Sequence, residues 1–249
     1  MKDIAGLVAV RSDSTRLPRK AFRKIQGKNL IDVLIDRLED TEYLDDFIIC
    51  TTTKQSDNAI EDLCKNRGVK YFRGSEKDVL SRFINASEIV PSKYVSRITG
   101  DNPLSDFEQM HKCYRFVVKN NLDYSRPDGV PCGTAIEVIR ADALKQLKSM
   151  TLTPELTEYM TFFFEQAPFI KWDLYTVSDS VKMPDLRLTV DYEEDLNFIN
   201  KILDDFEHFP TLEEIVSYCK KLDSYPNALE KFDFKKLDKI RESIKFKEV

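Results

Sequence analysis

The stretch Val8-Ala-Val-Arg-Ser-Asp-Ser-Thr-Arg-Leu-Pro-Arg-Lys20 begins inside a short apolar run, residues 4–10. That run is continuous, rich in strand-favouring residues and bounded by charge, which predicts a buried β-strand. The cations and hydroxyls then form a loop at the carboxyl end of the strand, where open α/β sheets bind their ligands. A solvated basic loop is the alternative, since runs of charge usually face water. The position after a buried first strand favours a site for a polyanion such as a nucleoside triphosphate.

Composition sets the class of protein. The 249 residues carry a formal net charge of −5, which argues against bulk binding to nucleic acid or to an anionic membrane. Five cysteines without a CxxC pair indicate reduced thiols. No apolar run reaches the roughly 20 residues that span a bilayer, and the N-terminus lacks the long apolar stretch of a signal peptide. We therefore expect a soluble, cytoplasmic protein.

Strand and helix patterns alternate through the first half of the chain. This β-α-β-α order predicts an α/β fold with a doubly wound, mainly parallel sheet. After the first strand, further strands are predicted over residues 46–53, 69–72 and 93–99. Helices are predicted over residues 29–38, 57–67, 76–89 and 106–119, with Ser56 or Asp57 capping the second, Gly68 ending it and Ser75 capping the third.

The second half is less regular but predicts one domain, residues 1–249, with a core over about 1–205 and a helical cover over 206–249. Residues 123–133 have the composition of a loop. Strands are predicted over residues 134–139, 170–177 and 186–190, the second of them in a small side sheet. Helices are predicted over residues 141–147, 153–166 and 193–206, and two more over 211–249.

Several kinds of site are excluded by what the sequence lacks. Its seven glycines are too widely spaced for a dinucleotide-binding GxGxxG or a GxxxxGK[ST] phosphate loop. Both histidines, His111 and His208, fall in predicted helices, so neither a histidine-based zinc site nor a Ser/His/Asp triad is expected. The cysteines show no metal-binding spacing either.

Two aspartates follow predicted strands. Asp101 comes after the strand over residues 93–99 and Asp191 after the strand over residues 186–190. Either one alone could simply cap the next helix. Together, facing a basic loop, they predict a Mg²⁺–triphosphate site, because Mg²⁺ is typically held by one or two carboxylates plus substrate phosphates. Phosphoryl transfer at such a site needs positioning and charge stabilisation rather than a protein nucleophile.

Four blocks of sequence carry a family resemblance. Arg11-Ser-Asp-Ser-Thr-Arg-Leu-Pro-Arg-Lys20 resembles the signature of sugar-activating cytidylyltransferases, which include CMP-Kdo synthetase and CMP-acylneuraminate synthetases. Three further blocks resemble the SpsF-type branch, named for spore-coat polysaccharide synthesis: Phe72-Arg-Gly-Ser-Glu-Lys-Asp-Val-Leu-Ser-Arg-Phe83, Arg97-Ile-Thr-Gly-Asp-Asn-Pro-Leu104 and Arg187-Leu-Thr-Val-Asp-Tyr-Glu-Glu-Asp-Leu196. The resemblance extends from residue 4 to about 205 and implies a Rossmann-like nucleotide-diphospho-sugar transferase fold.

The resemblance also implies roles for individual residues, in three groups. The nucleotide group binds CTP, with catalytic roles for Lys20, Arg11, Arg16 and Asp101. The metal group, Asp101 and Asp191, holds Mg²⁺, and the acceptor group faces the second substrate. The nucleotide group is Arg11, Ser14, Arg16 and Lys20 at the phosphates, Arg73 near the cytidine, and Thr99 and Gly100; the acceptor group is Arg82, Glu137, Glu158 and Tyr159.

Plainer roles remain open for two acceptor residues, and one motif departs from the family. Arg82 could merely pair with Asp78 one helical turn earlier, and Glu137 could be buried with a basic partner. Where the family usually carries Arg-Glu-His, this chain has Thr157-Glu158-Tyr159. The acceptor side is therefore less well predicted than the nucleotide side.

These observations predict a cytoplasmic, Mg²⁺-dependent enzyme that transfers CMP from CTP to a sugar acid or phosphorylated sugar, releasing pyrophosphate, for surface glycan synthesis. Two alternatives stay open: the same fold with another donor or a non-sugar phosphate acceptor, and a non-catalytic nucleotide-binding relative. Uridylyl- and guanylyltransferases usually open with a glycine-rich loop, whose absence favours CTP. Relatives are often homodimers, and the strand over residues 170–177, with Trp172 and Tyr175, could form that interface or lie beneath the C-terminal helices.

Overall fold

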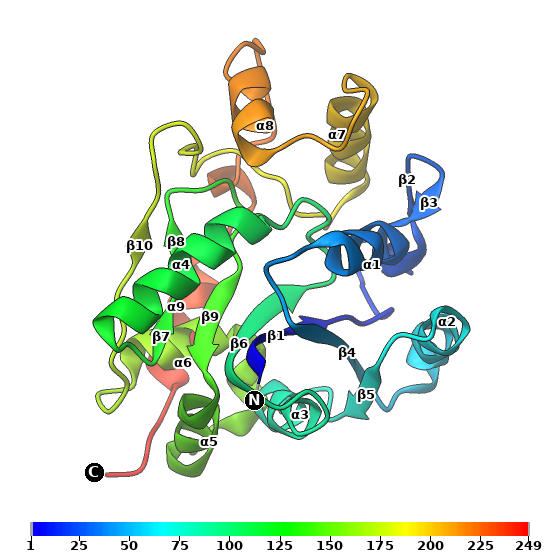
Figure 1. The fold of residues 1–249 in the computed structure, drawn as a ribbon. Coiled ribbons are helices and arrows are strands. Elements are labelled where there is room, and N and C mark those ends of the chain that lie inside the picture. The colour runs from blue at the N-terminus through cyan, green and yellow to red at the C-terminus, as the bar shows by residue number, and fades with distance from the viewer. Residues whose placement is uncertain (1, 249) are drawn as a thin grey trace.

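The protein is built on a central sheet, described here from a computed structural model that covers residues 2–248 (Figure 1). Within these residues the sheet has six strands in the order β5-β4-β1-β6-β9-β7. The first four are mutually parallel, and β9 runs antiparallel to both of its neighbours. The predicted mainly parallel α/β sheet is confirmed. The strands are β1 Lys2–Ala9, β4 Asp46–Thr52, β5 Tyr71–Gly74, β6 Ser92–Thr99, β7 Tyr124–Ser125 and β9 Glu137–Arg140.

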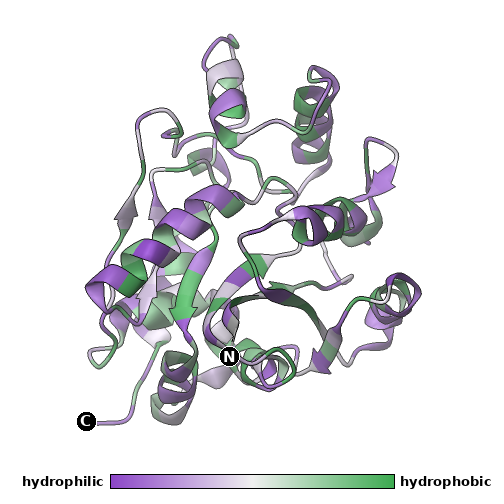
Figure 2. Ribbon diagram, in the orientation of Figure 1, coloured by the Kyte–Doolittle hydropathy of each residue, from purple (hydrophilic) through white to green (hydrophobic). Residues whose placement is uncertain are grey.

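Helices cover both faces of the sheet, and each face has its own core. One core packs α1, α2 and α4 against the sheet, and the other packs α3, α5 and α6. Figure 2 shows hydrophobic residues concentrated on the strands and on the helix faces toward them, with hydrophilic residues outside. The helices are α1 Leu30–Asp40, α2 Asn58–Arg67, α3 Val79–Ser87, α4 Phe107–Asn120, α5 Ala141–Met150 and α6 Met160–Gln166.

A third apolar cluster lies beyond the carboxyl ends of the strands. It packs α7 Glu193–Asp204 and α8 Leu212–Cys219 against residues around the short hairpin of β2 Lys24–Ile25 and β3 Lys28–Asn29. The predicted helical C-terminus is confirmed, and it ends with α9 Phe234–Ser243. Among residues 2–248, none of the helices combines the length and the apolar character needed to cross a bilayer.

Several predicted strands are wrong in their extent. The loop predicted over residues 123–133 contains β7 and β8 Pro127–Asp128, and the strand predicted from residue 134 begins only at Glu137. Residues 170–177 contribute just β10 Tyr175–Thr176, which pairs with β8 in the predicted side sheet. Residues 186–190 form no strand, only bridges from Leu186 and Arg187 to the loops beside them. These segments are buried against loops rather than paired along a sheet. Their alternating hydrophobic residues therefore predict longer strands than the structure contains.

Helix starts also differ from prediction. Asp78, not Ser75, caps α3, and its carboxylate accepts a hydrogen bond from the Ser81 N–H (2.9 Å). Asp57 precedes α2 without making a side-chain cap, because its carboxylate is used elsewhere. The helix predicted over 153–166 is a 3₁₀ segment, η3 Pro154–Tyr159, followed by α6. His208 lies in the connection between α7 and α8 rather than in a helix, whereas His111 lies in α4 as predicted.

Residues 186–190 bring a distant part of the chain to the end of β6. The Cys132 N–H donates to the Leu186 carbonyl oxygen (2.8 Å), and the Leu188 N–H donates to the Cys132 carbonyl oxygen (2.7 Å). The Val190 N–H donates to the Asp101 carbonyl oxygen (2.9 Å). Gly133 permits this approach: its φ is +96°, and a Cβ there would lie 2.5 Å from the Thr189 nitrogen. The position of Asp191 therefore depends on a glycine that lies 58 residues earlier in the sequence.

We expect Gly133→Ala to lower the free energy of unfolding by about 3 kcal/mol, because positive φ and overpacking both oppose a methyl group there. Gly129→Ala is the matched control. Its φ is +92°, but the methyl group would meet only the Lys182 side chain at 3.2 Å. That control should lose about 1 kcal/mol, the cost of the backbone conformation alone. Urea unfolding measures both, and equal losses in the two variants would show that the contact with residues 188–189 is unimportant.

Candidate active site

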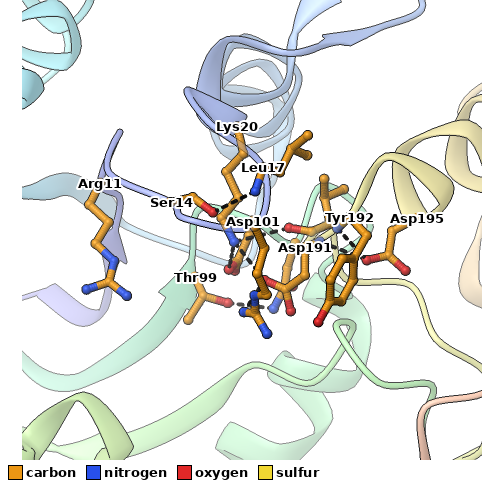
Figure 3. A network of polar contacts seen from close by, with 12 residues as sticks. Arg11, Ser14, Leu17, Lys20, Thr99, Asp101, Asp191, Tyr192 and Asp195 are labelled. Carbon is orange, nitrogen blue, oxygen red and sulfur yellow. Dashed lines mark hydrogen bonds and ion pairs between the residues drawn. The ribbon is translucent and has the colours of Figure 1, made fainter. Parts of the chain in front are cut away.

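Lys20 joins the two aspartates that were expected to face the basic loop. Its ammonium lies 2.6 Å from Asp101 Oδ2 and 3.0 Å from Asp191 Oδ1, and it also donates to the Val190 carbonyl oxygen at 3.1 Å (Figure 3). The side chains of Lys20 and Asp191 are largely buried. The structure therefore brings together three predicted site residues that are separated by up to 171 positions in the sequence.

The sheet explains why they meet. β1 and β6 are neighbouring parallel strands, so the loop carrying Lys20 and the turn carrying Asp101 leave the same edge. The Gly100 N–H donates to the Ala9 carbonyl oxygen (2.8 Å), and a Cβ at Gly100 would lie 2.5 Å from Val10 Cγ2. Glycine at position 100 thus lets the two loops touch. Thr99 accepts a hydrogen bond from the Asn102 amide (2.5 Å) and so steadies the same turn.

The charges at this centre stabilise one another. Burial lowers the pKa of Lys20, but the charges of Asp101 and Asp191 outweigh it, so the pKa lies above its ordinary value. Burial raises the pKa of Asp191, but the positive charge of Lys20 outweighs it and the pKa is lowered. Arg16 adds a further ion pair to Asp191 (2.7 Å). Lys20 is therefore a cation and Asp191 an anion throughout the physiological range of pH.

Arg187 and Asp195 hold Asp191 in place, and the sequence analysis assigned neither a role. Buried Arg187 donates to Asp191 Oδ2 (2.9 Å) and to Asp195 Oδ1 (2.9 Å). Asp195 accepts from the backbone N–H groups of Asp191 (2.8 Å) and Tyr192 (2.9 Å) at the start of α7. Their spacing of four and eight residues was visible in the sequence. The predicted strand over residues 186–190 gave no reason to expect the Arg187 side chain to reach Asp191 and Asp195, so their interaction was not predicted.

Asp57 fixes the start of the basic loop after β1. The sequence analysis considered this residue only as a helix cap. Asp57 is fully buried and accepts hydrogen bonds from the backbone N–H groups of Ser12 (2.7 Å) and Thr52 (3.2 Å). Further along, the Ser14 hydroxyl accepts from the Leu17 N–H (3.2 Å). The Asp57 carboxylate and the Ser14 hydroxyl thus fix the loop, while the guanidinium groups of Arg11 and Arg16 stay about half exposed.

Arg11 and Arg16 lie at the two ends of this loop. Figure 3 shows Arg11 on one side of Asp101, and Asp191 with Tyr192 on the other. Arg11 pairs with Glu158 of η3 (2.6 Å), and both side chains are about half exposed. Such an exposed ion pair is worth little, so an incoming anion can displace the carboxylate at small cost.

Arg73, which was expected near the cytidine, uses its guanidinium to bind other residues of the chain. Its guanidinium donates to the carbonyl oxygens of Thr52 (2.8 Å) and Lys54 (2.6 Å) and pairs with Glu61 (2.5 Å). These contacts tie the ends of β4 and β5 to α2. Arg73 therefore braces the wall beside the basic loop and leaves few donors for a ligand.

Two predicted acceptor residues have contrasting surroundings. Glu137 is buried with a basic partner, as the plainer alternative held: it pairs with Arg97 (3.1 Å) and accepts from the Tyr124 hydroxyl (3.1 Å) and from Thr161. Arg82 is not paired with Asp78. It is only 5% exposed, donates to the Ser75 carbonyl oxygen (2.9 Å), and its buried Nε has no partner among the described residues. Burial lowers the pKa of Arg82, and the nearby Arg11 charge adds to that effect.

The segment that departs from the family pattern is η3. Thr157 is fully buried, and its hydroxyl donates to the Pro154 carbonyl oxygen (2.7 Å) and accepts from the Leu80 N–H at the start of α3 (3.3 Å). Tyr159 stacks on Phe162 (ring centroids 6.2 Å apart). Threonine at position 157 thus has a packing role, and Glu158 and Tyr159 remain partly exposed.

The donor set fits a divalent metal only when phosphates are bound. Asp101 and Asp191 point toward one cationic position, where the Lys20 ammonium now stands in for a cation. No group of three or more His, Cys, Asp or Glu side chains in residues 2–248 could hold a metal by itself. Mg²⁺ takes one or two carboxylates and completes its shell with phosphate oxygens and water. The pair is therefore suited to a metal that arrives with a nucleotide.

Comparison with known proteins gives the class. A family model described as Cytidylyltransferase matches residues 5–231. The chain is 35% identical over 205 residues to an uncharacterised protein of Methanocaldococcus jannaschii, covering 82% of this chain and 84% of that one. It is 30% identical over 208 residues to the spore coat polysaccharide biosynthesis protein SpsF of Bacillus subtilis, covering 81% and 87% respectively.

Solved structures show the same fold. A cytidylyltransferase from Leptospira borgpetersenii superposes with a TM-score of 0.81 at 23% identity, covering 89% of this chain and 95% of that one. CMP:2-keto-3-deoxy-manno-octonic acid synthetase, solved with CTP, superposes with a TM-score of 0.64 at 14% identity, covering 82% and 99%. The fold is that of a nucleotidyltransferase. The chain belongs to the cytidylyltransferase family, and the resemblance to its SpsF-type branch is confirmed.

We expect Asp191→Asn to lower the free energy of unfolding by about 2 kcal/mol near neutral pH, because charged hydrogen bonds to Lys20 and Arg187 are lost. The folded-state pKa of Asp191 is lowered, so its contribution is present above the ordinary aspartate range and disappears as the pH falls through the folded-state value. Urea unfolding at pH 7 and pH 3 measures the difference, which should narrow in acid. Asp173→Asn, at an exposed position, is the control, and a constant difference between pH 7 and pH 3 would contradict the charge argument.

Proposed function

We propose that this protein transfers CMP from CTP to a sugar acid or phosphorylated sugar and releases pyrophosphate, in a reaction that depends on Mg²⁺. The observation that carries the proposal is the convergence of Lys20, Asp101 and Asp191 at the end of a basic loop. This arrangement offers two carboxylates for a metal and several cations for a triphosphate within one edge of the sheet. The relationship to SpsF supports an acceptor that belongs to polysaccharide synthesis.

The residues would divide the work by charge. Arg11, Ser14, Arg16 and Lys20 would bind the phosphates of CTP, with Thr99 and Gly100 shaping the neighbouring turn. Asp101 and Asp191 would hold Mg²⁺, which when bound would neutralise charge that develops at the α-phosphate. The Lys20 ammonium, already between the two carboxylates, would move to the phosphates as the metal enters.

The reaction itself needs no protein nucleophile. An acceptor oxygen forms the new bond to the α-phosphorus, while the bond from that phosphorus to the pyrophosphate oxygen breaks. Fixed cations around the phosphates stabilise the charge that accumulates on the leaving group. Positioning supplies the rest, since holding the acceptor oxygen in line with the leaving group replaces a costly bimolecular encounter.

The acceptor side is proposed from the unpaired charge of Arg82. A buried guanidinium with an unpartnered Nε is costly, and it is suited to a carboxylate or phosphate that enters with the substrate. Glu158 and Tyr159 lie at the rim of this region through η3. Glu137 would act through Arg97 and Thr161 rather than by contact, because its carboxylate already has those partners.

The cellular setting completes the proposal. We place the enzyme in the cytoplasm, where CTP is available, and propose that it acts as a homodimer. Trp172 and Tyr175, the residues considered for an interface, pack partly against the apolar cores of this chain. Light scattering tests the oligomeric state.

We expect Lys20→Ala and Asp101→Ala each to reduce turnover at least about 100-fold, because each removes a charge that acts on the transferring phosphate. The assay measures pyrophosphate release from CTP and Mg²⁺ with a panel of sugar acids and sugar phosphates, among them 3-deoxy-manno-octulosonate. Lys24→Ala, on the exposed hairpin, is the matched control and should keep full activity. Full activity in either site variant would defeat the assignment, and CTP binding without turnover on any acceptor would favour a nucleotide sensor.

We expect Arg82→Met to reduce kcat/KM for the acceptor about 10- to 100-fold, the value of a charged hydrogen bond. The free energy of unfolding should stay level or rise, because methionine fills the space without burying a charge. Arg126→Met is the control, since Arg126 is partly buried but, unlike Arg82, has a carboxylate partner, Glu165 (3.0 Å). That variant should lose stability and keep its activity. A large loss of stability in Arg82→Met would show that the arginine is structural.

A further inference from the structure

The chain continues past the matched family region, and this extension is ordered. Residues 232–243, here named the C-terminal strap, follow the match, which ends at residue 231. Asp233 caps α9 by accepting a hydrogen bond from the Lys236 N–H (3.0 Å). Two of the strap's aromatic side chains are unusually exposed, Phe232 at 39% and Phe234 at 53%, and their ring centroids lie 6.0 Å apart. Exposed aromatic side chains of this size mark binding surfaces more often than chance would.

One end of the strap is fixed beside the metal-binding aspartate. Lys231, the residue before it, pairs with Glu194 (2.6 Å) and lies over the Tyr192 ring (4.9 Å from the centroid). Tyr192 directly follows Asp191, and the Arg16 guanidinium faces the same ring (5.4 Å). The strap therefore starts where the basic loop meets Asp191.

The other end is fixed beside η3. The Arg241 guanidinium lies over the Phe162 ring (4.2 Å), and Phe162 stacks on Tyr159. Beyond the strap, the Lys247 N–H donates to the Met150 carbonyl oxygen (2.8 Å), and the Leu152 N–H donates to the Lys245 carbonyl oxygen (2.9 Å). Figure 1 shows this red segment running from the region of α7 and α8 toward α6.

These two ends lie on opposite sides of the site. Arg11 and Tyr192 flank Asp101 (Figure 3). Arg11 is bonded to Glu158 of η3, and Tyr192 is contacted by Lys231. The basic loop and the strap are therefore linked at both ends. They meet near Asp191 and Tyr192 at one end and near η3 at the other. The proposed function assigns the basic loop to the triphosphate, which leaves the side bounded by the strap for the acceptor.

We propose that the C-terminal strap is the acceptor-side wall of the active site, and that Phe232 and Phe234 contact the ring of a carbohydrate acceptor. This inference rests on the proposed function, because it assigns a role within the same site. Aromatic rings suit the apolar faces of sugars, and a wall fixed at both ends limits the size of acceptor that fits.

The test compares Phe234→Ala and Arg241→Ala with Lys235→Ala, an exposed position on the same helix. For whichever panel sugar releases pyrophosphate, KM for the acceptor should rise roughly fivefold in the first two variants, as expected for losing an aromatic or cation–π contact. KM for CTP should not change, and Lys235→Ala should match the wild type. Arg241→Lys, which keeps the cation over Phe162, should recover most of the loss.

A second measurement does not depend on turnover. Hydrogen exchange over α9 is followed in the wild type with CTP and Mg²⁺, and then with each panel sugar added singly. Slower exchange over α9 with a sugar supports the wall, even where no sugar turns over and the proposed function fails. A sugar that turns over without slowing α9, equal rises in both KM values, or no slowing with any sugar would overturn the strap proposal.

Discussion

The site depends on one lysine that lies between two carboxylates contributed by distant parts of the chain. Asp101 and Asp191 would repel each other if they stood alone at this separation, and the Lys20 ammonium removes that repulsion. The remaining cations, Arg16 and Arg187, neutralise Asp191 from its other sides. The folded protein thus holds the two aspartates close together before any metal or nucleotide arrives, which is the preorganisation that charge stabilisation requires.

Backbone contacts make this arrangement stiff. The turn at Gly100 rests on the strand end at Ala9, and Val190 donates to the Asp101 carbonyl oxygen, so both aspartates are placed by hydrogen bonds of the main chain. Buried Asp57 fixes the start of the basic loop in the same way. The guanidinium groups, by contrast, are held by exposed ion pairs such as Arg11–Glu158, which cost little to break. The main chain therefore fixes the two carboxylates, whereas the arginine side chains can exchange partners, which suits the proposed binding and release of a triphosphate.

The sequence predicted the features that depend on a local pattern of residues. It did not predict the features that depend on contacts between residues far apart in the chain. Continuous apolar runs predicted β1, β4 and β6, and basic residues after a buried strand located the loop that carries Lys20. Residues 186–190 alternate like a strand, yet they pair only through isolated bridges with loops, which no periodicity reveals. The roles of Arg187, Asp195 and Asp57 were missed for the same reason: each acts on a backbone group or a side chain that only the fold brings near. The contacts of Arg73 were equally hidden, since nothing in the sequence shows that its guanidinium donates to the carbonyl oxygens of Thr52 and Lys54.

The two halves of the proposed site are built differently, and this difference allows acceptor specificity to vary separately from nucleotide binding. The nucleotide half is built from strand ends, where a substitution at Gly100 or Asp57 disturbs several backbone groups at once. The proposed acceptor half is built from η3, from buried Arg82, whose Nε has no partner among the described residues, and from the strap, which lies beyond the matched family region. Thr157 is buried at this position and its hydroxyl bonds to the backbone of Pro154 and Leu80, so the fold needs no arginine there. Acceptor choice can therefore vary on this side without moving Lys20, Asp101 or Asp191, because none of the backbone contacts that place them passes through η3 or the strap.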